Sequence, residues 1–221
     1  MIKLVAVDFD NTLCMTEAGT YKLESDVCLA MGFPMMDREV HKKTSGMILH
    51  ESMKLRMPGI DIDEFVARLH AEQPKYVASG ILDKIDSKNI ETLRRLKKAG
   101  VSIVILSSRS KIELLHMMEI KHPLSKLIDD FYYYENTTFH KPDPRVFDPM
   151  IQKYKFKRSE IVYIGDTVSD VVATKEASIH FIASLECGLR TKSDFADVIV
   201  DEFVEDFVQI EPLILSDRFA E

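Results

Sequence analysis

The sequence has few of the features that mark several common classes of protein. It contains only three cysteines in 221 residues, Cys14, Cys28 and Cys187, and their spacing matches neither a CxxC pattern nor a set of zinc ligands. It therefore indicates neither a disulfide framework nor a structural zinc site, and it favours a reducing compartment. The N-terminal apolar run ends at Asp8, too early for a signal peptide or a membrane span, and no later stretch is long enough. We therefore expect a cytoplasmic protein without a membrane partner.

An excess of positive charge is also missing. The formal net charge is -7, whereas binding to nucleic acid requires a basic face, so we expect no nucleic-acid partner. The chain has no GxGxxG or P-loop motif, so a bound nucleotide cofactor is not indicated. Its seven histidines form no HxxxH pair or other zinc pattern, and we interpret them as surface or structural residues. With 46% apolar residues, the chain has the composition of one globular domain or a domain with an insertion.

Short apolar runs alternate with helical patterns over most of the chain. The runs that we expect to form strands are residues 4–7, 101–106, 130–134, 161–164, 179–183 and 198–200. One helix is predicted over 87–100, with Ser87 as its N-cap and Gly100 at its C-terminal stop. This alternation predicts an α/β fold with a doubly wound parallel (Rossmann-like) sheet, which binds ligands at the carboxyl ends of its strands.

Residues 14–80 interrupt the alternation. No run there is typical of a strand, the pattern is helical, and Pro34, Pro58 and Pro74 lie near expected helix boundaries. We therefore predict an inserted α-helical subdomain over residues 14–80, and an α/β core over residues 1–13 and 81–221.

Polar side chains follow several of the predicted strands. They are Asp8 and Asp10 after the first strand, Ser107, Ser108 and Arg109 after the second, Lys141 after the third, and Asp166 and Asp170 after the fourth. For each of these residues, an ordinary structural role is the alternative to a functional one. Asp10 would lie in a turn, Ser107 would cap a helix, and Lys141 would be a surface cation. Asp166 and Asp170 would lie in a turn and in the first turn of a helix, where carboxylates suit the helix dipole. For Arg109 the expected role is a solvated helix start, with contact to a substrate anion as the alternative. Together, and in this order, these residues indicate an active site.

The motifs DFDNT (8–12), the apolar run ending in Ser107, HKPDP around Lys141, and GDTVSD (165–170) resemble those of the haloacid dehalogenase superfamily. The resemblance covers nearly the whole chain. It is to the branch of phosphoglycolate phosphatase and β-phosphoglucomutase, whose helical cap the insertion resembles. The segment TSGM (44–47) is similar to a cap loop that faces the site in that branch. The sequence departs from the pattern at several positions: Asn11 and Ser178 stand where glycine is common, and Glu186 and Cys187 precede Gly188 where an aromatic residue is frequent.

The resemblance implies a magnesium-dependent phosphatase that hydrolyses small phosphate monoesters through an aspartyl-phosphate. Asp8 would be the nucleophile and Asp10 the acid and then the base. Lys141 would stabilise the developing negative charge. The remaining implied roles are substrate binding by Thr12, Ser107, Ser108, Lys43 and Ser45, and Mg²⁺ binding by Asp8, Asp10 through its carbonyl, Asp166 and Asp170.

Two other functions stay open at this point. A phosphosugar mutase would use the same aspartyl-phosphate and return the phosphoryl group to a sugar. A non-catalytic phosphometabolite-binding protein would need no acid or base, so the intact pair Asp8 and Asp10 argues against it. The expected partner is a small phosphorylated metabolite, and we expect a monomer or homodimer.

Overall fold

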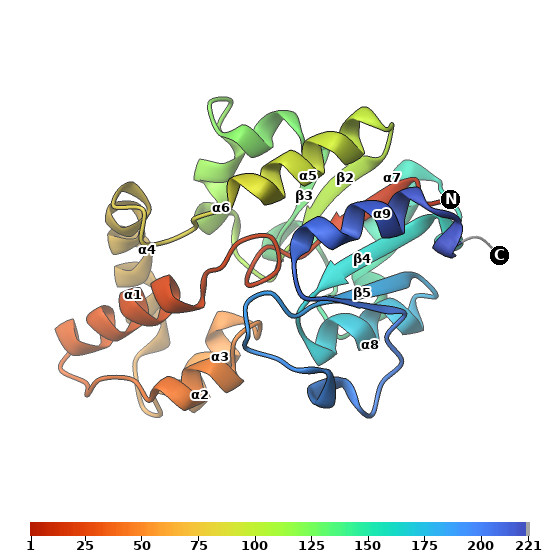
Figure 1. Ribbon diagram of the computed structural model, residues 1–221. Coiled ribbons are helices and arrows are strands. Elements are labelled where there is room, and N and C mark those ends of the chain that lie inside the picture. Colours follow the sequence, from red (N-terminus) through yellow and green to blue (C-terminus); the bar gives the residue numbers. More distant parts are fainter. Residues whose placement is uncertain (220–221) are drawn as a thin grey trace. The chain divides into compact units, whose positions relative to one another are not determined.

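The computed structural model describes residues 1–219 of the chain, which form two compact units (Figure 1). One unit, the core, comprises Met1–Leu13 and Ile85–Glu221, and the other, the insertion, comprises Cys14–Lys84. The sequence pattern predicted that the insertion ends at residue 80. It extends to Lys84 because Leu82, an apolar residue beyond Gly80, is buried in the apolar cluster of the insertion itself.

The core contains a six-stranded sheet in the order β3-β2-β1-β4-β5-β6, and every neighbouring pair is parallel. The strands are β1 (Leu4–Val7), β2 (Ser102–Leu106), β3 (Asp130–Tyr132), β4 (Ile161–Gly165), β5 (His180–Ser184) and β6 (Glu202–Val204). The predicted fold class is thereby confirmed. The chain adds strands on one side of β1 and then on the other, so the point at which the strand order reverses lies between β1 and β4. Sheets of this kind bind ligands at the carboxyl ends of the strands at that point.

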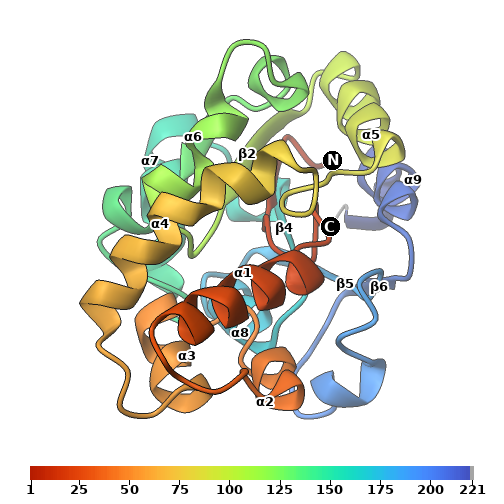
Figure 2. The same ribbon diagram turned by 90° about the vertical axis from the view of Figure 1, so that its left-hand side faces the viewer.

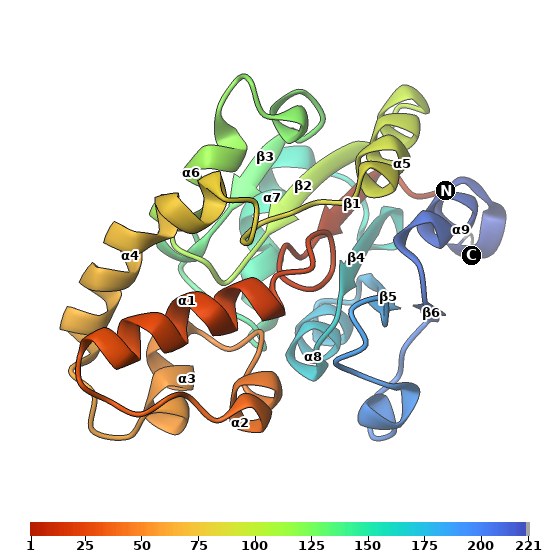
Figure 3. The same cartoon turned by 60° about the vertical axis from the view of Figure 1, so that its left-hand side comes forward.

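Helices cover both faces of this sheet (Figures 1 and 3). Their bounds in the core are α5 (Ser87–Lys98), α6 (Lys111–Met118), α7 (Asp148–Tyr154), α8 (Val168–Glu176) and α9 (Ile210–Leu215). On one face, α5 and α9 lie side by side. On the other, α7, α8 and the short 3₁₀ helix η3 (Pro144–Phe147) contribute to an apolar cluster with residues of β1, β2, β4 and β5. Both faces of the central strands are therefore buried, which explains their continuous apolar runs.

The prediction of a strand over residues 198–200 was wrong. The last strand is β6, Glu202–Val204, which pairs with β5 from Ile182↔Glu202 to Ser184↔Val204. The residue before it, Asp201, accepts a hydrogen bond from the Phe181 amide (2.7 Å) and so sets where pairing begins. Val198 and Val200 pack against the core without pairing, whereas Ile199 is exposed. Val198 and Val200 are therefore apolar because they pack against the core from a loop, not because they belong to a strand.

Helix α5, the first helix of the core after the insertion, begins at Ser87, but its N-cap is not the predicted one. Asp86, rather than Ser87, is the N-cap of α5, because its carboxylate accepts a hydrogen bond from the Lys88 amide (2.9 Å). Gly100 follows the helix with φ 87°, a backbone conformation that favours glycine.

Helices connected by loops make up the insertion, and none of its residues 14–84 belongs to a strand of the sheet (Figure 2). It consists of α1 (Glu17–Ala30), α2 (Arg38–Lys43), α3 (Leu49–Arg56) and α4 (Ile62–Ala78). Leu23, Met53 and Phe65 are among the buried residues of its apolar cluster. The expectation that Pro74 marks a boundary was wrong, because this residue lies inside α4. Across residues 1–219, none of the helices has the length and apolar character that a membrane span needs.

Candidate active site

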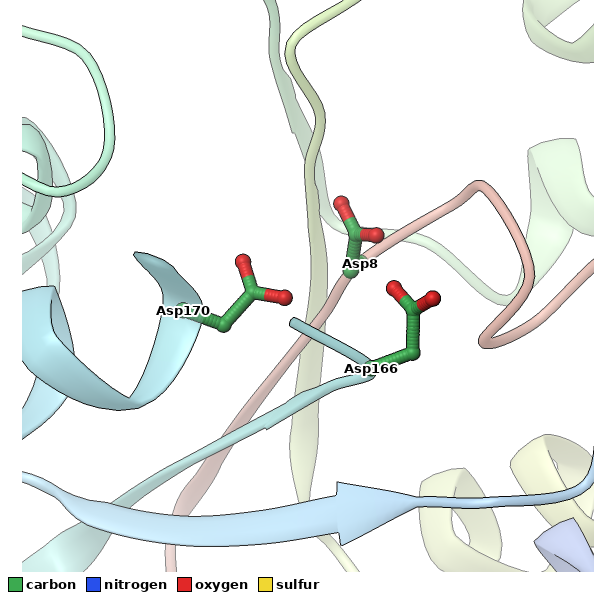
Figure 4. Close-up of side chains that lie close together, drawn as sticks. All are labelled: Asp8, Asp166 and Asp170. Atoms are coloured by element: carbon green, nitrogen blue, oxygen red, sulfur yellow. The ribbon is translucent and has the colours of Figure 1, made fainter. Parts of the chain in front are cut away.

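Three buried aspartates come together at the carboxyl ends of β1 and β4 (Figure 4). Asp8 follows β1, and its amide donates to the carbonyl of Ile164 in β4 (2.8 Å), which fixes the two strand ends against each other. Asp166 follows β4, and Asp170 lies in the first turn of α8. One carboxylate oxygen from each of Asp8, Asp166 and Asp170 lies within 4.8 Å of the others. The structure thus brings together residues that are far apart in the sequence.

Asp166 has the properties of a cation ligand. It is 1% exposed, and neither of its carboxylate oxygens has a hydrogen-bond partner among the described residues. Burial, and then the carboxylates of Asp8 and Asp170, raise the pKa of Asp166 well above its ordinary value. Burial also raises the pKa of Asp8, to about 7, against the opposing effect of Lys141. A buried carboxylate without a donor is costly, and a divalent cation with oxygen ligands would satisfy it, so these residues fit such an ion.

Asp170 is committed to protein donors. Its Oδ2 accepts hydrogen bonds from the amide (2.9 Å) and the hydroxyl (2.7 Å) of Thr167, the N-cap of α8, and its Oδ1 lies 2.7 Å from Lys141 Nζ. A Cβ at Gly165 would lie only 2.6 Å from Asp170 Oδ2, so the glycine of the GDTVSD motif is required by close approach. The geometry shows Asp170 holding Lys141 and the start of α8. Its role as a metal ligand stays a prediction.

Lys141 is held by three acceptors. Its Nζ donates to Asp8 Oδ1 (2.9 Å), to Asp170 Oδ1 (2.7 Å) and to the hydroxyl of Tyr163 (2.9 Å), and its side chain is 6% exposed. Burial alone would lower the pKa of Lys141, but Asp170 and Asp8 together keep it well above its ordinary value. The three donors of an ammonium group are therefore all used, and the charge lies against the carboxylate of Asp8.

Tyr163 is the residue at this site that the sequence reasoning missed. It is fully buried on β4, and its hydroxyl accepts from Lys141 and donates to the carbonyl of Leu106 (3.2 Å). The available signal was a residue with a hydroxyl in the otherwise apolar run IVYI, since a buried tyrosine hydroxyl needs a partner.

Asp10 does not lie in an open turn, because Arg109 binds both of its oxygens. Nε of Arg109 donates to Asp10 Oδ2 (2.9 Å) and Nη2 to Oδ1 (2.7 Å), and the guanidinium lies over the ring of Phe9, with 4.9 Å to the ring centroid. Arg109 is 8% exposed, so the expectation of a solvated helix start was wrong. The helix α6 begins only at Lys111, with Ser110 as its N-cap.

The predicted phosphate-binding hydroxyls of the core follow two neighbouring strands: Thr12 lies in the loop after β1, and Ser107 and Ser108 follow β2. Thr12 is fully buried, and its Oγ1 has no hydrogen-bond partner among residues 1–219. Ser107 is buried and accepts from the Arg109 amide (3.2 Å), whereas Ser108 is half-buried. Asn11 has φ 56°, which explains why glycine is common at this position and why asparagine can replace it.

The two predicted substrate contacts of the insertion, Lys43 and Ser45, belong to the other unit. Lys43 is exposed at the end of α2, and Ser45 is buried just after it. Between them, Thr44 accepts a hydrogen bond from Arg56 Nε (2.7 Å), and Arg56 in turn pairs with Glu24 (2.6 Å), so this loop is tied to the interior of the insertion. Substrate recognition by Lys43 and Ser45 stays a prediction.

Comparison with known proteins agrees with this geometry. Residues 5–184 match the model of the haloacid dehalogenase-like hydrolases. A phosphoglycolate phosphatase of Vibrio parahaemolyticus is 24% identical over 80% of this chain and 80% of its own, and a phosphorylated carbohydrates phosphatase of Thermotoga maritima is 24% identical over 82% and 84%. A haloacid dehalogenase-like hydrolase of Streptococcus pneumoniae has the same fold, with a TM-score of 0.77, 17% identity, and coverage of 95% and 96%. The chain therefore belongs to the haloacid dehalogenase-like hydrolase family.

Proposed function

We propose that the protein is a magnesium-dependent phosphatase that hydrolyses small phosphate monoesters through an aspartyl-phosphate. The observation that carries the proposal is the pairing of Asp8 with the buried ammonium of Lys141, beside the unpartnered oxygens of Asp166. The relatives support it, since they are named for phosphoglycolate and for phosphorylated carbohydrates, which are small phosphate esters. The cysteines at 14, 28 and 187 form no disulfide, which is compatible with action in the cytoplasm.

The side chains of the core supply the parts that such a reaction needs. A phosphate monoester resists an anionic nucleophile because its oxygens repel the attacking group, so the site has to neutralise charge and hold the reacting atoms in line. Asp8 attacks phosphorus, and Lys141 stabilises the negative charge that develops beside it. The hydroxyls of Thr12 and Ser107 donate to the phosphoryl oxygens, with Ser108 beside them.

Asp10 completes the set as the acid for the leaving oxygen and then the base for the attacking water. It follows Asp8 by two residues, at the same strand end, and no other aspartate of the DFDNT motif is available for this role.

Mg²⁺ would be held by Asp8, Asp166 and the carbonyl of Asp10, with Asp170 orienting the site from the next turn. The ion supplies positive charge that holds the phosphoryl group and offsets its repulsion of the nucleophile. Magnesium suits these ligands because they are all oxygens and few enough to leave places for water. Calcium should substitute poorly, because its coordination is larger and looser.

The test is a screen of small phosphate esters with Mg²⁺, with EDTA, and with Ca²⁺. We expect turnover with Mg²⁺, none in EDTA, and recovery when Mg²⁺ is restored. The variant Asp8→Asn should lose turnover while keeping its fold, whereas Asp197→Asn, a control at an exposed aspartate of the core, should keep both. Full activity in exhaustively chelated protein, or near wild-type turnover by Asp8→Asn with reversion to aspartate excluded, would contradict the proposal. Product analysis on phosphosugars would detect a mutase.

A further inference from the structure

We infer that Asn89, in the first turn of α5, is a positioning residue for the catalytic loop, which comprises residues 8–13. Its side-chain amide holds the far end of this loop and thereby keeps Asp10 and Thr12 in place for the reaction. The inference rests on the proposed function, because the reaction concerned is the one proposed above.

The catalytic loop is held to the core at both of its ends. At its start, the amide of Asp8 donates to the carbonyl of Ile164 (2.8 Å). At its end, the carbonyl of Leu13 accepts a hydrogen bond from Asn89 Nδ2 (3.2 Å), although 76 positions separate the two residues in the sequence. Leu13 is the last residue of the core before the chain enters the insertion. The amide of Asn89 therefore ties the loop to α5 at the point where the chain leaves the core.

The residues between these two ends are those that the proposed reaction uses. Asp10 is the acid and base, and Thr12 is fully buried with a hydroxyl that has no hydrogen-bond partner among residues 1–219. Thr12 adjoins Leu13, so a shift of the Leu13 carbonyl would also displace the hydroxyl that donates to a phosphoryl oxygen. A displacement of about 1 Å in a catalytic group can lower a rate by about a hundredfold.

The part of α5 that carries Asn89 is itself fixed. The backbone amide of Asn89 donates to the carbonyl of Asp86, the N-cap of the helix (3.0 Å). The preceding residue, Lys88, pairs with Glu186 in the loop after β5 (2.8 Å) and with Asp206 (2.9 Å). The first turn of α5 is thus bound to other segments of the core, and it can support the end of the catalytic loop.

Stability alone does not explain an asparagine at this position. Asn89 is 1% exposed, and its Oδ1 has no hydrogen-bond partner among the described residues. A buried acceptor without a donor destabilises the folded protein, and an apolar side chain, like those of Ile90 and Leu93 on the same helix, would avoid this cost. The apolar side chain would also leave the Leu13 carbonyl without its donor, so the two effects oppose each other. A side chain that is only half satisfied in this way is expected where a residue serves function.

The first experiment measures hydrogen–deuterium exchange by mass spectrometry in Asn89→Leu, since leucine branches at the same atom as asparagine and has no donor. We expect the amides of residues 8–13 to exchange about tenfold faster or more than in the wild type, with the rest of the core unchanged. Unchanged exchange of the catalytic loop would overturn the inference. Equally faster exchange throughout the core would also overturn it, because that is the sign of a structural role. If Asn89→Leu does not fold, Asn89→Ala tests the same contact.

Thr92→Val is the matched control for both experiments. Thr92 is a fully buried polar residue of the same helix, but its hydroxyl bonds within the helix, to the carbonyl of Lys88 (2.9 Å). This variant should leave the exchange of the catalytic loop as it is in the wild type. The same acceleration in Thr92→Val as in Asn89→Leu would show that the loop responds to any change in α5, and the inference would be wrong.

The second experiment follows the turnover of p-nitrophenyl phosphate at saturating Mg²⁺. Asn89→Leu should lower kcat by about 10- to 100-fold and leave KM within about threefold, because the geometry of the reaction is lost and the binding of the ester is not. Its Tm should stay within about 3 °C of the wild type, and Thr92→Val should keep kcat. A kcat of Asn89→Leu within about twofold of the wild type, or an equal loss in Thr92→Val, would contradict the positioning role.

The two experiments separate this inference from the proposed function. If the wild type does not hydrolyse the ester in a Mg²⁺-dependent manner, the proposed function fails, and the exchange measurement decides whether Asn89 holds residues 8–13. If the ester is hydrolysed but neither exchange nor kcat responds to Asn89→Leu, only the role of Asn89 is wrong.

Discussion

Replacement of Asp166 by asparagine should stabilise the metal-free protein. Asp166 is 1% exposed, both of its oxygens lack a partner among the described residues, and Asp8 and Asp170 lie beside it. Placing an unpaired charge there costs several kcal/mol. The amide of asparagine removes the charge and leaves polar atoms whose burial costs about 1–3 kcal/mol. We therefore expect Asp166→Asn to raise the free energy of unfolding by about 1–3 kcal/mol at pH 7.5 in EDTA.

The assay is thermal unfolding followed by far-UV circular dichroism, in EDTA and in Mg²⁺. For a chain of this size the gain corresponds to a Tm about 3–10 °C higher than that of the wild type. In Mg²⁺ the difference in Tm between the variant and the wild type should close or reverse. A ligand at a hundred times its Kd adds about 2.7 kcal/mol to the free energy of unfolding, but only of a protein that binds it. Asp197→Asn is the control. The reasoning is refuted if Asp166→Asn melts below the wild type in EDTA at pH 7.5, or gains as much as the wild type from Mg²⁺.

The cost of burying carboxylates at this site should also make the stability of the wild-type protein depend on pH. Burial raises the pKa of Asp8 from 3.8 to about 7, so the folded state binds a proton more tightly than the unfolded state does. Stability in EDTA is then highest near pH 4 and falls as the pH rises toward 7, by as much as about 4 kcal/mol if Asp8 titrates alone. The slope from Asp8 should vanish above about pH 7 and below about pH 4, where both states carry the same number of protons on this group. A Tm in EDTA that rises between pH 5 and pH 7 would contradict this sign.

Two further substitutions test the surroundings of the site. Tyr163→Phe removes the hydroxyl that lies 2.9 Å from Lys141 Nζ, so it should lower Tm by about 2–6 °C. It should also lower kcat several-fold with little effect on KM, because Lys141 is positioned less well. An unchanged kcat would contradict this positioning role of Tyr163. Ser178→Gly should raise the free energy of unfolding by about 0.5–1 kcal/mol, because Ser178 has φ 57°, a backbone conformation that costs a residue with a Cβ more than it costs glycine. Urea unfolding measures this difference. A lower stability of the glycine variant would contradict the idea that the backbone of Ser178 is strained.

The sequence was sufficient for the sheet because its signals are local and strong. Four of the strands lie in apolar runs that are buried on both faces. The helix after the insertion ends before Gly100, as predicted, although its N-cap is Asp86 and not Ser87. The edge of the sheet was harder to predict. Before β6, Val198 and Val200 are apolar because they pack on the core, whereas pairing begins after Asp201, whose carboxylate accepts a hydrogen bond from β5. Hydrophobicity alone does not distinguish apolar residues that pack on the core from a loop from those that pair in a strand.

At the site, the motifs predicted which residues meet but not what each one contacts. The cluster of Asp8, Asp166 and Asp170 follows from the rule that the ends of neighbouring parallel strands meet. The rule also places Arg109 near Asp10, because β2 pairs with β1, but it does not predict their contact, since the long side chain of Arg109 can point to solvent or to the site. Tyr163 was hidden for a related reason, since its ring belongs to the apolar core and only its hydroxyl reaches Lys141.

The site is organised around a shortage of positive charge. Asp8, Asp166 and Asp170 are buried together, and Lys141 is the ammonium that pairs with the first and the third of them. Asp166 has no such donor among the described residues, so its carboxylate is the place at which an added cation gains most. The same shortage explains why stability and activity should respond in opposite directions when this carboxylate is neutralised. In the proposed mechanism, the carboxylate that destabilises the metal-free protein would be the one that binds the ion the reaction needs.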